Sequence, residues 1–198
     1  MKIPHILATI GLTAALALQG ADLPRPAPNM TFTMPAGGVI DLAQYRGKIV
    51  ALEFLSTTCP HCQKCSQILQ KMQDEYGAKG FQALGVATNP MSHMLVPDYV
   101  KNFALRFPVG FGPTEQAHEF LQHPVMLIMY VPQLVFIDRK GVIRSQFAGG
   151  SDFFKEEEKN VRGKIEEMLK GTASAPTSTG ATKAAPAKAG AAPAKKAS

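Results

Sequence analysis

The sequence has few cysteines, no tryptophan and no internal repeat, and its longest apolar run is short for a membrane span. Only three of its 198 residues are cysteines, which is too few for the two Cys-x-x-Cys pairs of a typical zinc site. A mean hydropathy of −0.02 excludes both a protein with many membrane spans and a wholly disordered chain. The length fits one ordinary domain with extensions.

The first 21 residues have the pattern of a secretory signal peptide. Lys2 precedes an apolar run over residues 6–18, which ends near an Ala-x-Ala pattern at residues 15–17. We expect cleavage between residues 17 and 21, and an uncleaved anchor is the alternative. In either case the domain is expected to work outside the cytoplasm, in the periplasm or the cell envelope.

Residues 171–198 consist mainly of Ala, Pro, Thr, Ser, Gly and Lys, without aromatic, branched aliphatic or acidic residues. Such a segment buries too little apolar surface to offset its ordering entropy, so a disordered tail is predicted. Its four lysines and Lys2 account for most of the formal net charge of +6, which leaves 16 basic and 15 acidic residues in 22–170. Nucleic acid is therefore not an expected partner. A solvated tail is favoured over contact with a membrane surface.

Between residues 22 and 170 the apolar pattern predicts one α/β domain. The run over 49–55 is apolar on both faces, which is typical of a central, largely parallel strand. Helices that alternate with strands imply a layered mixed sheet, flanked by helices and finished by an antiparallel hairpin. The predicted strands are 31–34, 39–41, 49–55, 81–88, 109–111, 133–137 and 142–147, and the predicted helices are 98–105, 115–121, 153–169 and one from Cys59 to Gly77 or Gly80.

The motif Cys59-Pro60-His61-Cys62 directly follows the central strand and opens a helix. Pro60 fits an early helical position, where a missing N–H costs nothing. The unpaired amides and the dipole of a helix N-terminus stabilise a thiolate, which is the nucleophile of disulfide exchange. Cys62 lies one turn further on, within disulfide reach. We predict a redox pair in which Cys59 attacks and Cys62 resolves the mixed disulfide; a structural or metal-bound pair is the alternative.

With these motifs the sequence resembles the thioredoxin superfamily, and in layout the extracytoplasmic thiol-disulfide oxidoreductases of the TlpA/ResA type. The resemblance covers about residues 27–169. It includes the leading hairpin, Arg-Gly-Lys at 46–48, the cysteine motif, a proline before the hairpin strand and Ile-Asp-x-x-Gly at 137–141. It implies a thioredoxin-like fold with an N-terminal β-hairpin. The 73 residues from Cys59 to Pro132 leave room for an inserted strand–helix unit, as in the TlpA and peroxiredoxin groups.

The resemblance also implies roles for three residues around the pair. Glu53 matches a buried acid that exchanges a proton with the second cysteine, and an acid that interrupts an apolar strand is costly unless it is paired or protonated. An exposed glutamate on an edge strand is the alternative. Pro132 matches a cis-proline that faces the disulfide, and there an extended substrate segment would pair with the backbone of Val131.

The sequence departs from the TlpA pattern at three places. It has no tryptophan, it has Thr58 directly before Cys59, and it has Val131 where a threonine is usual. Together with the Cys-Pro-His-Cys motif, this looks like the Dsb-type periplasmic oxidases. An imidazole at His61 can favour the Cys59 thiolate by charge or hydrogen bonding. Because a stabilised reduced form makes a disulfide a stronger oxidant, we favour an oxidising or isomerising role over a reducing one.

Several further residues have more than one functional or structural interpretation. Cys65 begins the apolar stripe of the helix, so a buried, inert thiol is favoured over a second resolving thiol or a copper ligand. The segment 125–130 is either the lining of a hydrophobic substrate groove or a buried strand or helix. Methionine and histidine residues raise a soft-metal site, but their spacing fits no site, and no metal is predicted; they are Met91, Met94, Met126, Met129, His93, His118 and His123.

The sequence thus predicts an exported thiol-disulfide oxidoreductase that needs no cofactor. Its expected partners are cysteine-containing exported proteins and a separate redox partner that resets the disulfide. The first alternative is a peroxiredoxin-like thiol peroxidase, which the Ser-Thr-Thr-Cys stretch at 56–59 weakly supports and Pro60 and Cys62 oppose. The second alternative is a Sco-like copper carrier, which would normally need a wider cysteine spacing and a dedicated distal histidine.

Overall fold

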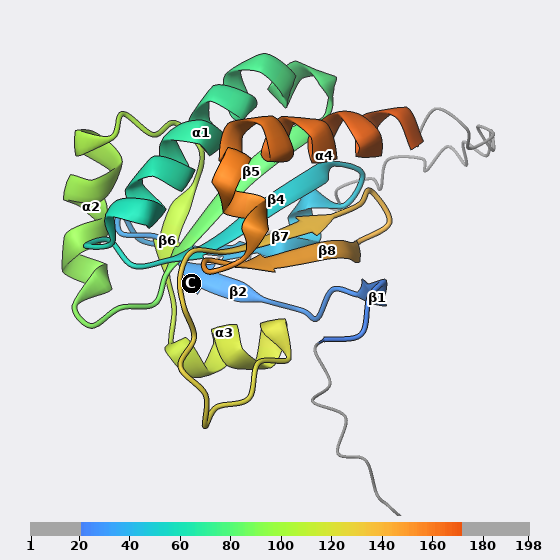
Figure 1. Ribbon diagram of the computed structural model, residues 1–198. Coiled ribbons are helices and arrows are strands. Elements are labelled where there is room, and N and C mark those ends of the chain that lie inside the picture. The colour runs from blue at the N-terminus through green and yellow to red at the C-terminus, as the bar shows by residue number, and fades with distance from the viewer. Residues whose placement is uncertain (1–20, 172–198) are drawn as a thin grey trace, which may run out of the picture.

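Eight strands form one mixed sheet within residues 21–171, the part of the chain that the computed structural model describes (Figure 1). β4 lies parallel to β5, and β5 lies parallel to β6, while every other neighbouring pair is antiparallel. The predicted mixed sheet with a closing antiparallel hairpin is therefore confirmed. In spatial order the strands are β1 (Arg25–Pro26), β8 (Val142–Ala148), β7 (Gln133–Ile137), β4 (Ile49–Leu55), β5 (Phe81–Ala87), β6 (Val109–Phe111), β2 (Thr31–Thr33) and β3 (Val39–Asp41).

The central strand β4 is buried along its whole length because helices cover both faces of the sheet. Side chains alternate between the faces, so Ile49, Ala51 and Leu55 join one core cluster, and Val50, Leu52 and Phe54 join the other. The first cluster includes side chains of α1, α2 and α4, and the second includes side chains of α3. By the same alternation, Glu53 points to the face covered by α1.

The helices agree with the sequence in number but not in every boundary. They are α1 (Pro60–Tyr76), α2 (Ser92–Asn102), α3 (Thr114–Leu121) and α4 (Glu157–Gly171). The prediction of 98–105 for the second helix was wrong at both ends. It was wrong at its start because Pro97 lies inside α2 although proline is normally confined to the first turn, and at its end because α2 stops at Asn102. The last helix was also predicted to start too early, because residues 152–156 form a separate 3₁₀ turn before α4.

The predicted signal peptide and the predicted tail lie outside the described residues, apart from Ala21 and Gly171. Within residues 21–171, none of the helices has the length and apolarity that a membrane crossing requires.

Candidate active site

Cys59 caps the N-terminus of α1 and is half-buried. Pro60 occupies the first helical position, as the sequence predicts. The backbone of Cys59 is held by the strand-to-helix turn, because its N–H donates to the Ser56 carbonyl at 3.1 Å. Its Sγ lies 4.0 Å from the Val131 carbonyl oxygen. The thiol at the start of the helix therefore faces the segment before β7.

Cys62 lies one turn further along α1 and is fully buried. Its Sγ accepts a hydrogen bond from the Ser56 N–H at 3.5 Å. Burial raises the pKa of the Cys62 thiol, and the nearby charge of Glu53 raises it further. All three cysteines are free thiols in this structure. The two members of the motif thus differ in accessibility, in the sense expected for an attacking and a resolving thiol.

The peptide bond between Val131 and Pro132 is cis, as the resemblance implied. A glycine at the end of β8 packs directly against it: a Cβ at Gly149 would lie 2.7 Å from the Val131 carbonyl oxygen. Only a residue without a side chain fits there, because real Cβ contacts are essentially never shorter than 3.0 Å. The close approach of Gly149 fixes the segment that faces Cys59.

Glu53 is completely buried below the motif, between β5 and β7. The alternative of an exposed glutamate on an edge strand is therefore wrong. Burial raises the pKa of Glu53 to about 8, the hydrogen bond from Ser66 opposes this rise, and the charge of Glu157 adds to it. Because this pKa lies close to neutrality, Glu53 can both take up and release a proton under ordinary conditions.

A chain of short contacts joins Glu53 to the backbone of the motif. Ser66 Oγ lies 2.7 Å from Glu53 Oε2 and 2.8 Å from Tyr99 Oη, and Tyr99 donates to the Cys62 carbonyl oxygen at 3.1 Å. Three contacts need three protons, but the two hydroxyl groups supply only two. When Ser66 donates to an ionised Glu53, the contact between Ser66 and Tyr99 has no proton; a neutral Glu53 that donates to Ser66 instead supplies the missing one.

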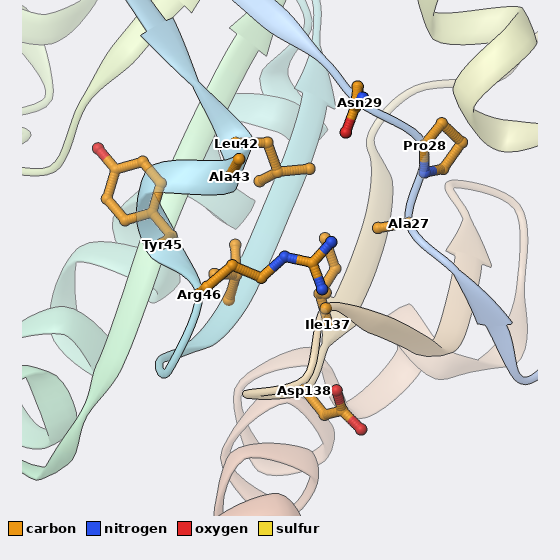
Figure 2. Close-up of a pocket in the computed structure, with 11 residues that line it drawn as sticks. Ala27, Pro28, Asn29, Leu42, Ala43, Tyr45, Arg46, Ile137 and Asp138 are labelled. Atoms are coloured by element: carbon orange, nitrogen blue, oxygen red, sulfur yellow. The ribbon is translucent and has the colours of Figure 1, made fainter. Parts of the chain in front are cut away.

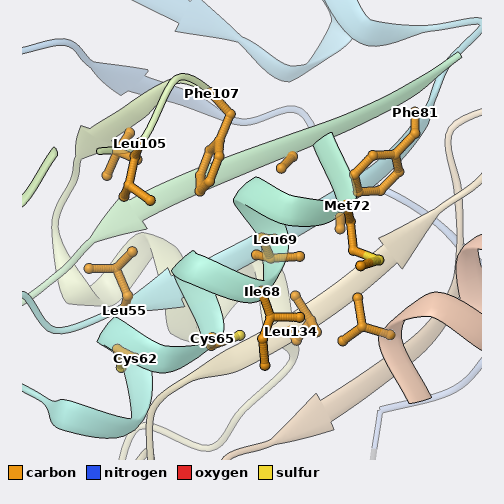
Figure 3. Close-up of a cluster of buried hydrophobic side chains, with 14 of the residues drawn as sticks. Leu55, Cys62, Cys65, Ile68, Leu69, Met72, Phe81, Leu105, Phe107 and Leu134 are labelled. Carbon is orange, nitrogen blue, oxygen red and sulfur yellow. The ribbon is translucent and has the colours of Figure 1, made fainter. Parts of the chain in front are cut away.

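Cys65 lies one turn beyond Cys62 and is also fully buried. Figure 3 shows both residues on α1 among the apolar side chains of the first core cluster. Burial raises the pKa of the Cys65 thiol well above its usual value, and the charges of Glu53 and Glu157 act in the same direction. This agrees with the favoured interpretation of Cys65 as a buried thiol.

Glu157 is a second buried acid near the motif, which the sequence analysis missed. Its side chain has no exposed surface, and its Oε2 lies 3.3 Å from Lys64 Nζ and 3.9 Å from His61 Nε2. The charged run 155–159 conceals it in the sequence. A signal does exist, because Glu157 lies four residues before Val161 and eight before Ile165, a spacing that places all three on the buried face of α4.

His61 connects the motif to this second acid. Its ring packs edge-on against Phe154 with centroids 4.8 Å apart, and a third of its side chain is exposed. The sequence placed His61 beside the cysteine pair, and the structure adds the contact of its Nε2 with Glu157.

The residues that raised a metal site in the sequence can be examined in the structure. His118 and His123 lie close together, with Nδ1 atoms 3.3 Å apart. Yet no group of three or more Cys, His, Asp or Glu residues within 21–171 is placed to hold a metal ion. A cavity of about 20 Å³, room for one water molecule, lies between Ala27, Arg46 and Asp138 (Figure 2). It adjoins Val50 at the start of β4, whereas the cysteine motif follows the end of that strand.

The sequence model of the AhpC/TSA family matches residues 24–146. The thiol-disulfide oxidoreductase ResA of Bacillus thuringiensis subsp. konkukian is 24% identical over 149 residues, which are 75% of this chain and 78% of that protein.

Similar solved structures include the following two. A thiol:disulfide interchange protein of the thioredoxin family from Chlorobium tepidum TLS aligns with a TM-score of 0.63 and 22% identity, covering 75% of this chain and 99% of that one. A secreted disulfide oxidoreductase of Mycobacterium tuberculosis aligns with a TM-score of 0.54 and 19% identity, covering 68% and 95%. These likenesses confirm the thioredoxin-like fold.

Proposed function

The chain belongs to the AhpC/TSA family, and we propose that within this family it acts as a thiol-disulfide oxidoreductase through Cys59 and Cys62. The arrangement of the two thiols carries this proposal. Cys59 is accessible and faces the cis Val131–Pro132 peptide, whereas Cys62 is buried above an acid that can hold a proton near neutral pH.

The first step is attack on a client disulfide. The Cys59 thiolate forms a bond to one sulfur of the client, the client's S–S bond breaks, and its second sulfur leaves as a thiolate that takes a proton. The client segment would lie along Val131, whose carbonyl is 4.0 Å from the attacking sulfur. Backbone pairing at Val131 would then hold a client irrespective of its side chains.

The second step resolves this mixed disulfide. Glu53 first releases its own proton to water, and its carboxylate then takes the proton of Cys62. The Cys62 sulfur attacks Cys59 Sγ, and the client leaves as a thiolate that is then protonated. The net result is that the S–S bond of the client is broken and an S–S bond between Cys59 and Cys62 is formed. The same steps in reverse oxidise a client dithiol, and Glu53 then returns the proton to Cys62.

We also propose that this exchange takes place outside the cytoplasm. The signal-peptide pattern over residues 1–21 supports this, as does the secreted Mycobacterium tuberculosis protein of the same fold. The partners would be exported proteins that contain cysteines, and a separate redox protein would reset the pair. Detection of the full-length chain in the cytoplasmic fraction, with its N-terminus intact, would contradict this location.

Trapping of mixed disulfides tests the exchange mechanism. A Cys62→Ser variant cannot complete the second step, so it should accumulate in cells as species covalently linked through Cys59 that disappear on reduction. The Cys59→Ser/Cys62→Ser double variant is the control and should show none. Failure of the single variant to form such species would argue against the mechanism. Efficient turnover of hydrogen peroxide with a thiol donor would instead favour the thiol peroxidase.

A further inference from the structure

The segment between α3 and β7 exposes a set of large apolar side chains beside the cis-proline. We call residues 124–131 the apolar loop. In Figure 1 it runs down past α3 and returns to the start of β7. The sequence left open whether residues 125–130 are buried, and the structure shows that a buried strand or helix is wrong. Five side chains are between 52 and 91% exposed: Val125, Met126, Leu127, Ile128 and Tyr130.

Both ends of the apolar loop are held by specific contacts. At its start, His123 Nδ1 lies 3.1 Å from the Pro124 carbonyl oxygen, and the Leu127 N–H donates to that same oxygen at 3.0 Å. At its end, the Gln133 side chain donates to the Tyr130 carbonyl at 2.8 Å. Met129 packs inward against the second core cluster. The fold therefore presents the five exposed side chains outward from an anchored loop.

We infer that the apolar loop is a docking surface for the client polypeptide, and that it selects extended client segments with uncharged, apolar side chains near the reactive cysteine. This inference rests on the proposed function. The loop is continuous with the exchange site, because Val131 is both its last residue and the residue that faces Cys59 Sγ. A client that crosses Val131 needs only to continue in the same direction to meet the loop.

The side chains of the apolar loop indicate which kind of client segment would bind there. No Asp, Glu, Lys or Arg occurs between Glu119 and Asp138, so nothing on the loop would recognise a charged client. Exposed apolar clusters mark interaction sites, and methionine adapts to side chains of different shapes. An anionic membrane would be held by a basic surface, whereas residues 22–170 carry 16 basic and 15 acidic residues.

The length of the loop sets where the client's apolar residues must lie. From Val131, three residues reach Ile128 and five reach Met126, which span at most roughly 10 and 17 Å. An extended client covers the same distances with a similar number of residues. Apolar side chains about three to five residues from the client cysteine would therefore meet the exposed part of the loop.

Two peptides and two variants of the full chain test this inference. The peptides have one cysteine pair and equal length, and they differ only in whether Leu and Ile or Ser occupy the positions three to five residues from the reactive cysteine. The Met126→Ser/Ile128→Ser variant removes two exposed side chains from the loop. The control Val39→Ser removes a valine that is 60% exposed on β3, an edge strand five places from β7 in the sheet.

The measured quantity is the ratio of kcat/KM for the apolar peptide to that for the serine peptide. Partial burial of two such side chains corresponds to a preference of about tenfold or more for the apolar peptide. We expect this ratio in the wild-type protein and in Val39→Ser, and a ratio near one in the loop variant.

Equal rates for both peptides in the wild-type protein, or a ratio unchanged in the loop variant, would overturn the docking inference alone. No exchange with either peptide would overturn the proposed function and this inference with it. Binding to phosphatidylglycerol vesicles and dimerisation are the rival uses of the loop. Either one would overturn the inference if the wild-type chain showed it, the loop variant abolished it, and the peptide ratio of the wild-type protein was near one.

Discussion

Replacing Glu53 by glutamine should remove a large part of the pH dependence of folding stability. Burial raises the pKa of Glu53 from 4.5 to about 8 in the folded protein. The folded state therefore keeps this proton at pH values where the unfolded chain has released it. Stability from this group is fully present below pH 4.5, is lost as the pH rises from 4.5 to 8, and changes little above that.

The magnitude follows from the shift itself. Each unit corresponds to about 1.36 kcal/mol, so the rise from 4.5 to about 8 removes roughly 5 kcal/mol of unfolding free energy in total. Most of this stability is already lost at pH 7, because pH 7 lies far above the unfolded-state pKa and only about one unit below the folded-state pKa. Because Glu53 has no exposed surface, solvent screening does not reduce the effect. Glu53→Gln has no proton to lose and should show none of this decline.

Urea unfolding of the reduced protein at several pH values measures the effect. The difference in unfolding free energy between Glu53→Gln and wild type should grow by about 4 kcal/mol from pH 5 to pH 9. Glu119→Gln, which changes an exposed glutamate of α3, is the matched control and should follow the wild-type curve. Parallel curves for Glu53→Gln and wild type would refute a neutral, buried Glu53.

Three further results are expected around the same site. Glu157→Gln should lower the upper end of the pH range of this stability loss, because it removes a charge that adds to the effect of burial on the folded-state pKa of Glu53; an unchanged upper end in the urea series would contradict this coupling. Tyr99→Phe should also lower the upper end of this pH range. It removes the contact between Ser66 and Tyr99, so Ser66 can donate to an ionised Glu53 and no remaining contact lacks a proton. A shift of the upper end to higher pH would disprove the proton count. Alkylation of the native reduced protein with iodoacetamide at pH 8 should modify Cys59 first and leave Cys65 unmodified until urea unfolds the chain, as followed by peptide mass spectrometry; rapid labelling of Cys65 would show that it is accessible.

Most of the sheet could be predicted because its strands are encoded locally. The uninterrupted apolar run of β4 predicted a strand buried on both faces, and the structure places it between β5 and β7. β1 could not be found this way. It has two residues, and its position depends on pairing with β8 and on Arg25, which donates to the Phe120 carbonyl at 2.8 Å. These partners are about a hundred residues away, so no local pattern reveals them.

Of the two buried acids at the site, one could be predicted from the sequence and the other could not. Glu53 could be predicted because a carboxyl group in an apolar strand is unexpected and calls for an explanation. Glu157 lies among charged residues at the start of a helix, where acids are favourable and common. Only the packing of α4 against α1 buries it, and that packing brings it to Lys64 and His61.

The exposure of the apolar loop could not be predicted, because hydrophobicity alone does not show whether a segment is buried or exposed. Residues 125–130 are as apolar as a core strand, yet β7 begins only at Gln133 and no strand pairs with the loop in the described part of the chain. Burial requires a partner surface, and the fold supplies one only for Met129. Folding therefore leaves the other large side chains in water, next to the residue that faces the attacking sulfur. Such an arrangement contributes little to folding stability, and it is useful when a client supplies the missing apolar surface at the moment of exchange.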